Sequence, residues 1–324
     1  MKPYLLLLSL VFLSLNACKR NIATSIGQKT ALEYKIKPSA TDARISKYNK
    51  KHCISINTNV VSKGKLLVFF PGTDAKPAYY TKILNEAAAM GYHAIGLMYA
   101  NNAEIYISCF FNKDSTCYEQ YRLEKFDGSD KAKRLNVDYT NSIQNRLIKL
   151  LAYLQRQHPE QNWQQFLSNE DVDWSKCVIA GHSQGGGHAA FIGQIKAVDR
   201  VVIFSSIDWI ISSKSSAAWV SKQGMTPKDR IYAFIHTKDE FFKYRNVQKQ
   251  WQNYGLDSLG KVVNIDVTNP PFDNSHTLIT TAKPALYIMT PYHFLTCVNQ
   301  FVPQNKKGEV DKQFINVWAY LLGK

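Results

Sequence analysis

The sequence predicts an α/β protein with a mostly parallel central sheet and helices on both faces. Short apolar runs alternate along the chain with segments that carry helical periodicity. The runs are apolar throughout, which is typical of parallel strands buried on both faces. Hydrophobic residues make up 45% of the chain and charged residues 20%. This ordinary globular composition excludes a disordered chain and a coiled coil.

The N-terminus has the pattern of an export signal. Lys2 precedes an apolar stretch over residues 5–15, which is broken only by serines and is too short to span a membrane as a mature helix. Leu-Asn-Ala then leads into Cys18, a pattern that resembles a bacterial lipobox. We expect a signal peptide over residues 1–17, lipidation at Cys18 and a polar tether over residues 18–50. The domain would then be held at a membrane of the bacterial cell envelope; the alternative is a plain secretory signal.

Charge narrows the classes of partner. Forty Lys and Arg residues against 25 Asp and Glu residues give a formal net charge of +15. Such a surplus suits lipid headgroups, acidic glycans or nucleic acid. No zinc-ligand spacing and no basic-aromatic motif supports a nucleic-acid partner. Because no phosphate-cradling or dinucleotide fingerprint occurs either, the sequence predicts no cofactor and no metal site.

Export also implies an oxidising compartment. Of the six cysteines, five remain after Cys18, so at least one stays unpaired if the others bond. Cys109 and Cys117 flank a polar, turn-rich stretch and are predicted to form a disulfide. Cys177 leads into an apolar strand and is predicted to be a buried free thiol. Pairing of Cys53 with Cys297 is left open.

Residues 51–324 are predicted to form one domain. The predicted strands cover residues 66–70, 93–98, 178–180, 201–204, 231–235 and 262–267. The predicted helices cover residues 83–90, 141–157 and 314–322. Two longer irregular insertions interrupt this alternation, over residues 101–135 and 211–228.

The third predicted strand runs directly into the pattern Gly-His-Ser-Gln-Gly over residues 181–185, followed by a small-residue helix start. A sharp strand-to-helix turn would expose the hydroxyl of Ser183, and side chains at positions 181 and 185 would collide with neighbouring elements. The helix N-terminus behind it would direct N–H groups towards the site. We therefore predict that Ser183 is a nucleophile.

A nucleophilic serine needs a base. In the chain order serine, acid, histidine, the base comes late. His276 follows the sixth predicted strand by nine residues and is the predicted base; His293, past a proline in a predicted helix, is the alternative. Asp239 directly follows the fifth strand and is the predicted acid, with Asp208 after the fourth strand as the alternative. Either aspartate could instead cap its loop.

A tetrahedral intermediate needs two N–H donors for its oxyanion. The backbone N–H of Gln184, directly after the nucleophile, is the first predicted donor. The second is assigned to Thr73, in the loop that follows the first predicted strand, because Gly72 allows that backbone to approach closely. Asp74 is unexpected here, since a carboxylate beside the oxyanion would oppose the developing charge unless it points away.

From residue 66 to residue 277 the chain resembles an α/β-hydrolase, and more narrowly a little-characterised group of exported bacterial α/β-hydrolases. The features that carry the resemblance are Pro71-Gly72-Thr73, Cys109 and Cys117 with Arg122 and Glu124, Gly181 to Ala189, and Ser275-His276. The resemblance implies the α/β-hydrolase fold.

The predicted function is a serine hydrolase of the carboxylesterase or lipase-like type that cleaves a carboxylic ester through an acyl-enzyme. The substrate would be a small-molecule, lipid or glycan ester, and the membrane would be a partner through the lipid anchor. An amidase or peptidase would use the same triad. A surface lipoprotein that uses a hydrolase scaffold only for binding is the alternative from another class.

Overall fold

The computed structural model describes residues 31–102, 109, 114, 116–132, 135–210, 213–288 and 290–323. The predicted signal peptide, Cys18 and the first part of the predicted tether lie outside these residues, as do several positions of the two predicted insertions. No helix in the described ranges is long and apolar enough to cross a membrane.

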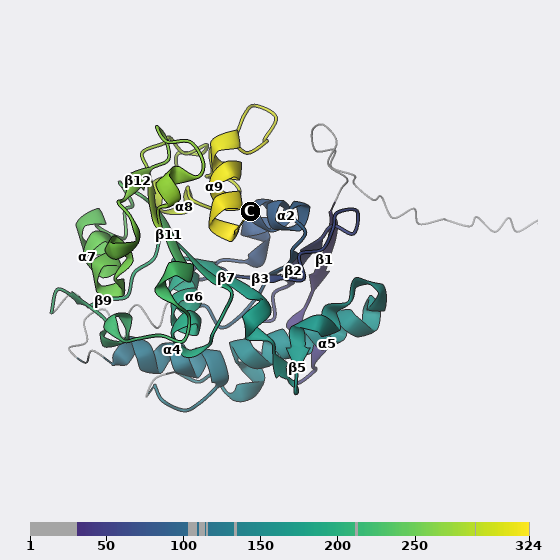
Figure 1. Ribbon diagram of the computed structural model, residues 1–324. Helices are drawn as coiled ribbons and strands as arrows, with labels where there is room; N and C mark the ends of the chain where they lie inside the picture. Colours follow the sequence, from purple (N-terminus) through teal and green to yellow (C-terminus); the bar gives the residue numbers. More distant parts are fainter. Residues whose placement is uncertain are drawn as a thin grey trace, which may run out of the picture.

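A nine-stranded sheet forms the centre of the protein, in the order β1-β2-β4-β3-β7-β8-β11-β13-β12 (Figure 1). β2 pairs antiparallel with both β1 and β4, and all other neighbours are parallel. The strands of this sheet are β1 Leu32–Ile36, β2 His52–Ile56, β3 Leu66–Phe70, β4 His93–Gly96, β7 Cys177–His182, β8 Arg200–Phe204, β11 Ile231–His236, β12 Val263–Asn264 and β13 Thr277–Thr280. Short two-residue strands, β5 Leu167–Ser168 with β6 Asp171–Val172 and β9 Trp209–Ile210 with β10 Ser215–Ser216, make two hairpins outside it.

Helices cover both faces of the sheet. Their bounds are α1 Pro38–Thr41, α2 Thr81–Ala89, α4 Cys117–Asp127, α5 Ile143–Gln157, α6 Gln184–Ile195, α7 Tyr244–Tyr254, α8 Pro291–Phe294 and α9 Lys312–Leu322. One core cluster joins α4, α5, α6 and α7 to the sheet, and a second joins α2 and α9 to the opposite face. Figure 1 shows the same three layers, with α2 and α9 on one side and α4, α5 and α6 on the other. The α/β prediction with a mostly parallel sheet is confirmed.

Alternate residues of β3 show why this strand has no polar face. Leu66, Val68 and Phe70 belong to the core cluster under α5 and α6, whereas Leu67 and Phe69 pack towards α2. All five side chains are fully buried. A strand covered on both faces must be apolar at every position. The same reasoning applies to β7, β8 and β11.

The sequence interpretation was wrong at both outermost strands of the sheet, β1 and β12. The predicted tether over residues 18–50 contains β1, which pairs with β2, so the sheet begins earlier than expected. Because β1 is an edge strand whose side chains are mostly exposed, its residues lack the apolar run of a central strand. The predicted strand over residues 262–267 is reduced to the two residues of β12, and Val267 is 82% exposed.

The sequence does not predict β13, which pairs with β11 on the side opposite β8. Its four residues, Thr-Leu-Ile-Thr, carry too short an apolar pattern to stand out in the sequence. As a consequence the last parallel strand before the predicted base was misplaced. This error has a direct effect on the site.

The disulfide between Cys109 and Cys117 is confirmed, with 5.6 Å between the Cα atoms. It joins Cys109 to the start of α4. Cys53, Cys177 and Cys297 are free and buried, which confirms the prediction for Cys177 and leaves Cys53 and Cys297 unpaired.

Candidate active site

Ser183 lies at the turn between β7 and α6, in a backbone conformation with φ 54° and ψ −123°. A non-glycine residue with positive φ is uncommon and stores strain. Its neighbours His182 and Gln184 are buried, whereas Ser183 is partly exposed. The prediction of a strained strand-to-helix turn with an accessible serine is therefore confirmed.

The two flanking glycines are required by close backbone contacts. A Cβ atom at Gly181 would lie 2.2 Å from the carbonyl oxygen of Gly185, and one at Gly185 would lie 2.1 Å from the carbonyl oxygen of Phe70. These distances are far below van der Waals contact with groups that cannot rotate away. The glycines thus allow α6 to start directly against the ends of β3 and β7.

Asp239 and His293 form a buried pair at the carboxyl end of β11. His293 Nδ1 lies 2.9 Å from Asp239 Oδ2, and both side chains are almost completely buried. The other carboxylate oxygen of Asp239 accepts hydrogen bonds from the backbone N–H groups of Phe241 and Phe242, each at 3.0 Å. With Nδ1–H donated to the carboxylate, His293 Nε2 carries the lone pair that a general base needs.

Glu240 holds the backbone of this histidine. Its carboxylate accepts hydrogen bonds from the N–H groups of Tyr292 at 3.1 Å and His293 at 2.8 Å, at the start of the short helix α8. The loop after β11 therefore orients His293 through its side chain by Asp239 and through its main chain by Glu240. Sequence reasoning missed Glu240, whose only signal was its position next to the predicted acid.

The predicted partner of Asp239, His276, is wrong. His276 lies just before β13, and its Nδ1 is 2.9 Å from the carbonyl oxygen of Ile231 at the amino end of β11. Asp239 follows the carboxyl end of that strand. Because β11 and β13 are parallel, a residue before β13 and a residue after β11 lie at opposite edges of the sheet. His293, the alternative, follows β13 and reaches the correct edge.

His276 is instead built into the structure around the amino end of β11. Its ring stacks on Tyr232 with 4.2 Å between the ring centroids, and its carbonyl oxygen accepts a hydrogen bond from Ala233. The guanidinium group of Arg200 also lies over the ring of Tyr232, with Cζ 4.2 Å from the ring centroid. Burial lowers the pKa of His276.

Asp208, the alternative acid, is engaged elsewhere. Its carboxylate forms a buried ion pair with Arg122 of α4 and accepts a hydrogen bond from Trp219 Nε1 at 3.1 Å. Arg122 also donates to the carbonyl oxygen of Gln184 at 3.2 Å. Asp208 and Arg122 thus hold the first turn of α6 in place. The structure pairs neither His276 nor His293 with Asp208.

Glu124, the other residue of α4 that carried the resemblance, supports the adjoining loop. Its carboxylate accepts hydrogen bonds from the backbone N–H groups of Lys131, Ala132 and Val137. A charged acceptor for several buried N–H groups orders a loop that lacks its own backbone pairing. α4, the helix of the first predicted insertion, therefore fixes both the turn at Ser183 and its own connection to α5.

The loop after β3 packs directly on the serine turn. A Cβ atom at Gly72 would lie 3.2 Å from Ser183 Cβ, which shows how closely the two backbones approach. Asn101 holds this loop by donating from Nδ2 to the carbonyl oxygens of Gly72 at 2.7 Å and Ala75 at 2.8 Å. Asp74 is exposed and has φ 53°. Thr73 therefore lies between a residue packed on Ser183 and a residue at the surface.

A chain of buried hydrogen bonds connects this loop to His293. Gly72 N–H donates to Tyr80 Oη at 3.1 Å, and Tyr80 Oη lies 3.1 Å from His182 Nδ1. His182 Nε2 lies 2.9 Å from the carbonyl oxygen of His293. A carbonyl oxygen only accepts, so Nε2 carries the proton, and Nδ1 accepts from the tyrosine hydroxyl. Every donor in this chain has one acceptor.

His182 remains neutral in this arrangement. Burial holds its pKa well below the usual range, and the nearby His293 lowers it further. The rings of His182 and His293 are 4.7 Å apart between centroids. Ser183 Oγ makes no hydrogen bond to the described residues. His293 contacts the turn at Ser183 through His182, the residue that precedes Ser183.

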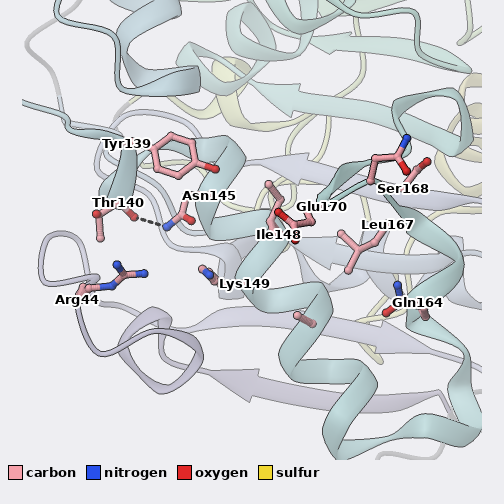
Figure 2. Close-up of a pocket in the computed structure, with 12 residues that line it drawn as sticks. Arg44, Tyr139, Thr140, Asn145, Ile148, Lys149, Gln164, Leu167, Ser168 and Glu170 are labelled. Carbon is pink, nitrogen blue, oxygen red and sulfur yellow. Dashed lines mark hydrogen bonds between the residues drawn. The ribbon is translucent and has the colours of Figure 1, made fainter.

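Other features of the described surface do not contribute to this arrangement. A hollow of about 530 Å³ lies over α5 and the β5–β6 hairpin, with Arg44, Lys149 and Glu170 among its lining residues (Figure 2). Neither Ser183, Asp239 nor His293 lines it. Within the described ranges, no group of three or more His, Cys, Asp or Glu residues is arranged to hold a metal ion.

Compared with known proteins, the chain matches no family model and no curated sequence. The function of the protein is therefore inferred from the geometry of the site.

Proposed function

We propose that the protein is a serine hydrolase of the α/β-hydrolase fold, with Ser183 as nucleophile, His293 as base and Asp239 as acid. The observation that carries the proposal is the buried Asp239–His293 pair beside the strained turn that exposes Ser183. The strand order supports the fold assignment, because the nucleophile, acid and base follow β7, β11 and β13 at one edge of a mostly parallel sheet.

In the proposed reaction, Ser183 Oγ attacks the carbonyl carbon of an ester while its proton moves to His293 Nε2. The N–H groups of Gln184 and Thr73 stabilise the oxyanion. The intermediate collapses, the C–O bond breaks, and the alcohol leaves with the proton from His293. Water then attacks the acyl-enzyme, again giving a proton to His293, and the carboxylic acid is released with Ser183 regenerated.

A fluorophosphonate probe, followed by p-nitrophenyl esters of increasing acyl length, tests this proposal. The probe should label the wild-type protein but not Ser183→Ala, and His293→Ala should label at a strongly reduced rate. His276→Ala is the matched control, because it removes a buried histidine at the opposite edge of the same strand pair. Absence of labelling in a folded wild-type protein would contradict the proposal and favour a non-catalytic binding role.

An amide substrate would use the same residues, so the ester assignment needs its own measurement. Parallel assays with matched ester and anilide substrates should give the larger kcat/KM for the ester. A larger value for the anilide would change the assignment to an amidase.

We also propose that Cys18 is lipidated and holds the domain at a cell-envelope membrane. The lipobox-like pattern after the apolar stretch supports this. Cys18→Ala should abolish partitioning of the expressed protein into the detergent phase. Continued partitioning of that variant would place the anchor elsewhere.

A further inference from the structure

Two loops that carry the proposed acid and base also expose apolar side chains. In the loop that leads to His293, Leu286, Tyr287 and Ile288 are consecutive and 37%, 59% and 53% exposed. In the loop that follows Asp239, Phe241 is 52% exposed. We call these four residues the apolar rim. A run of exposed apolar residues in a folded protein is costly unless it has a binding role.

The apolar rim borders the candidate active site. The ring of Phe241 lies 4.7 Å from that of His293, and the ring of Tyr287 lies 6.4 Å from that of Tyr292. α8, which holds His293, packs against β11 (Figure 1). A partner that covers the apolar rim is therefore held close to His293.

Exposed lysines lie on the same two loops as the apolar rim. Lys238, Lys243 and Lys283 are exposed on the same two loops, and none of them forms an ion pair with a described residue. Lys238 Nζ lies 5.9 Å from the ring of Tyr292. Two carboxylates lie beside them and bind neutral donors: Glu240 accepts hydrogen bonds from two backbone N–H groups, and Asp266 accepts hydrogen bonds from Thr280 and Thr281. The loops therefore combine exposed apolar side chains with three lysines that make no ion pair with a described residue.

We propose that the apolar rim docks the protein onto an anionic lipid bilayer, with the loops that carry Asp239 and His293 facing the bilayer. Apolar side chains would enter the acyl boundary while the lysines contact the headgroups. The further step, that the substrate is an ester whose acyl chain lies in that bilayer, rests on the proposed function. The docking itself does not.

Charge favours a bilayer over a second copy of the chain. A symmetric dimer through the apolar rim would bring the same lysines of both copies together. The whole chain carries a formal net charge of +15, which opposes self-association and favours an anionic surface. Other strongly exposed apolar residues, such as Val61 and Val267, are far from the rim in sequence. They lie neither in the loop that follows β11 nor in the loop that follows β13.

The docking is tested with a fluorescent probe in the full chain. In a Cys18→Ser background, Tyr287→Cys is labelled with an environment-sensitive dye and mixed with phosphatidylcholine–phosphatidylglycerol vesicles that carry a lipid-embedded quencher. Cys53, Cys177 and Cys297 are buried and should not label in the native protein. Val61→Cys is the matched control, because Val61 is 92% exposed and any N-terminal attachment acts equally on both variants.

The probe at position 287 should shift to the blue and be quenched at least about threefold more than the probe at position 61. Replacing the three lysines by alanine, or using uncharged vesicles, should remove most of that difference. Equal quenching of both probes, or none, would overturn the proposal. A concentration-dependent shift at position 287 without vesicles would overturn it in favour of self-association.

A second pair of assays separates docking from catalysis. Repeating the quenching experiment with Ser183→Ala should leave it unchanged. Leu286→Ser with Ile288→Ser should raise KM for a vesicle-embedded ester about tenfold and leave a short soluble ester within about twofold. An equal loss on both esters would contradict the role of the rim. If the wild-type protein hydrolyses neither ester, the proposed function fails, while the probe still decides the docking.

Discussion

The two ends of β11 each hold a buried histidine, and the comparison between them shows why only one of them is placed to act as the proposed base. At the amino end, His276 binds a carbonyl oxygen of Ile231 and stacks on Tyr232. At the carboxyl end, His293 binds the carboxylate of Asp239 and lies beside the residue that precedes Ser183. A carbonyl oxygen fixes the ring of a histidine, but a carboxylate also stabilises the imidazolium that forms during proton transfer.

The difference follows from strand polarity. In parallel sheets, loops that follow the strands meet at one edge, where ligands bind, and loops that precede them meet at the other. His276 and His293 flank the same strand, β13, on opposite sides. Seventeen positions along the chain therefore separate a structural histidine from a candidate base.

The largest expected effect separates the two histidines directly. His293→Ala should reduce kcat/KM for a p-nitrophenyl ester by at least about 10⁵-fold, because it removes the proposed base. His276→Ala should stay within about threefold while lowering the melting temperature, because it removes a stacked, hydrogen-bonded ring. Steady-state assays on both folded variants check this. A crippled His276→Ala with an active His293→Ala would reverse the comparison.

Substitution of the two aspartates should have different kinds of effect, one on catalysis and one on stability. Asp239→Asn should lower kcat by about 10⁴-fold, by analogy with serine proteases, because an amide favours the wrong imidazole tautomer. Asp208→Asn should instead destabilise the fold by about 3–5 kcal/mol, because the buried Arg122 loses its ion-pair partner. Kinetics with urea unfolding curves measure both effects. If the asparagine at position 208 caused the larger loss of kcat in a folded protein, Asp239 would not be the acid.

Tyr80→Phe tests the buried hydrogen bonds that connect Gly72 to His293. Losing the hydroxyl leaves Gly72 N–H and His182 Nδ1 without their partner, so kcat should fall about tenfold and stability by about 1–3 kcal/mol. Tyr92→Phe is the control, since Tyr92 donates a buried hydrogen bond to Leu322, away from the site. It should lose stability but not kcat. Equal effects on kcat in both variants would contradict a positioning role for Tyr80.

The last expected effect concerns pH and extends the comparison to six other buried histidines. Burial lowers the pKa of His52, His93, His182, His188, His236 and His276, that of His52 to about 3. The unfolded chain takes up protons at these positions below about pH 6.5, whereas the native protein takes them up only at lower pH. The free energy of unfolding should therefore decrease from pH 6.5 to pH 5, by about 2 kcal/mol for His52 alone.

Thermal melts at constant ionic strength check this prediction. The melting temperature should be lower at pH 5 than at pH 7, a window in which carboxylates with ordinary or lowered pKa values remain ionised in both states. A higher melting temperature at pH 5 would mean that histidines gaining stabilising partners on protonation outweigh the buried neutral ones.

The sequence by itself determined the central part of this protein. Residues 66–70 and 231–235 are apolar throughout, so only strands covered on both faces can accommodate them. The turn at Ser183 was also predictable from the sequence pattern, because glycines at positions 181 and 185 leave space for backbone contacts that no side chain would allow. The Cys109–Cys117 pair was predictable from its short separation and the inferred compartment.

Only the tertiary structure decided which histidine meets Asp239. A pattern of apolar residues identifies a central strand, but edge strands such as β1 and short strands such as β13 have too little of it. Without β13, the chain after Asp239 had no reference to the edges of the sheet, and His276 and His293 could not be assigned to opposite sides. Pairing between strands distant in sequence supplies that reference, because it fixes both the direction of a strand and the edge at which its loops lie.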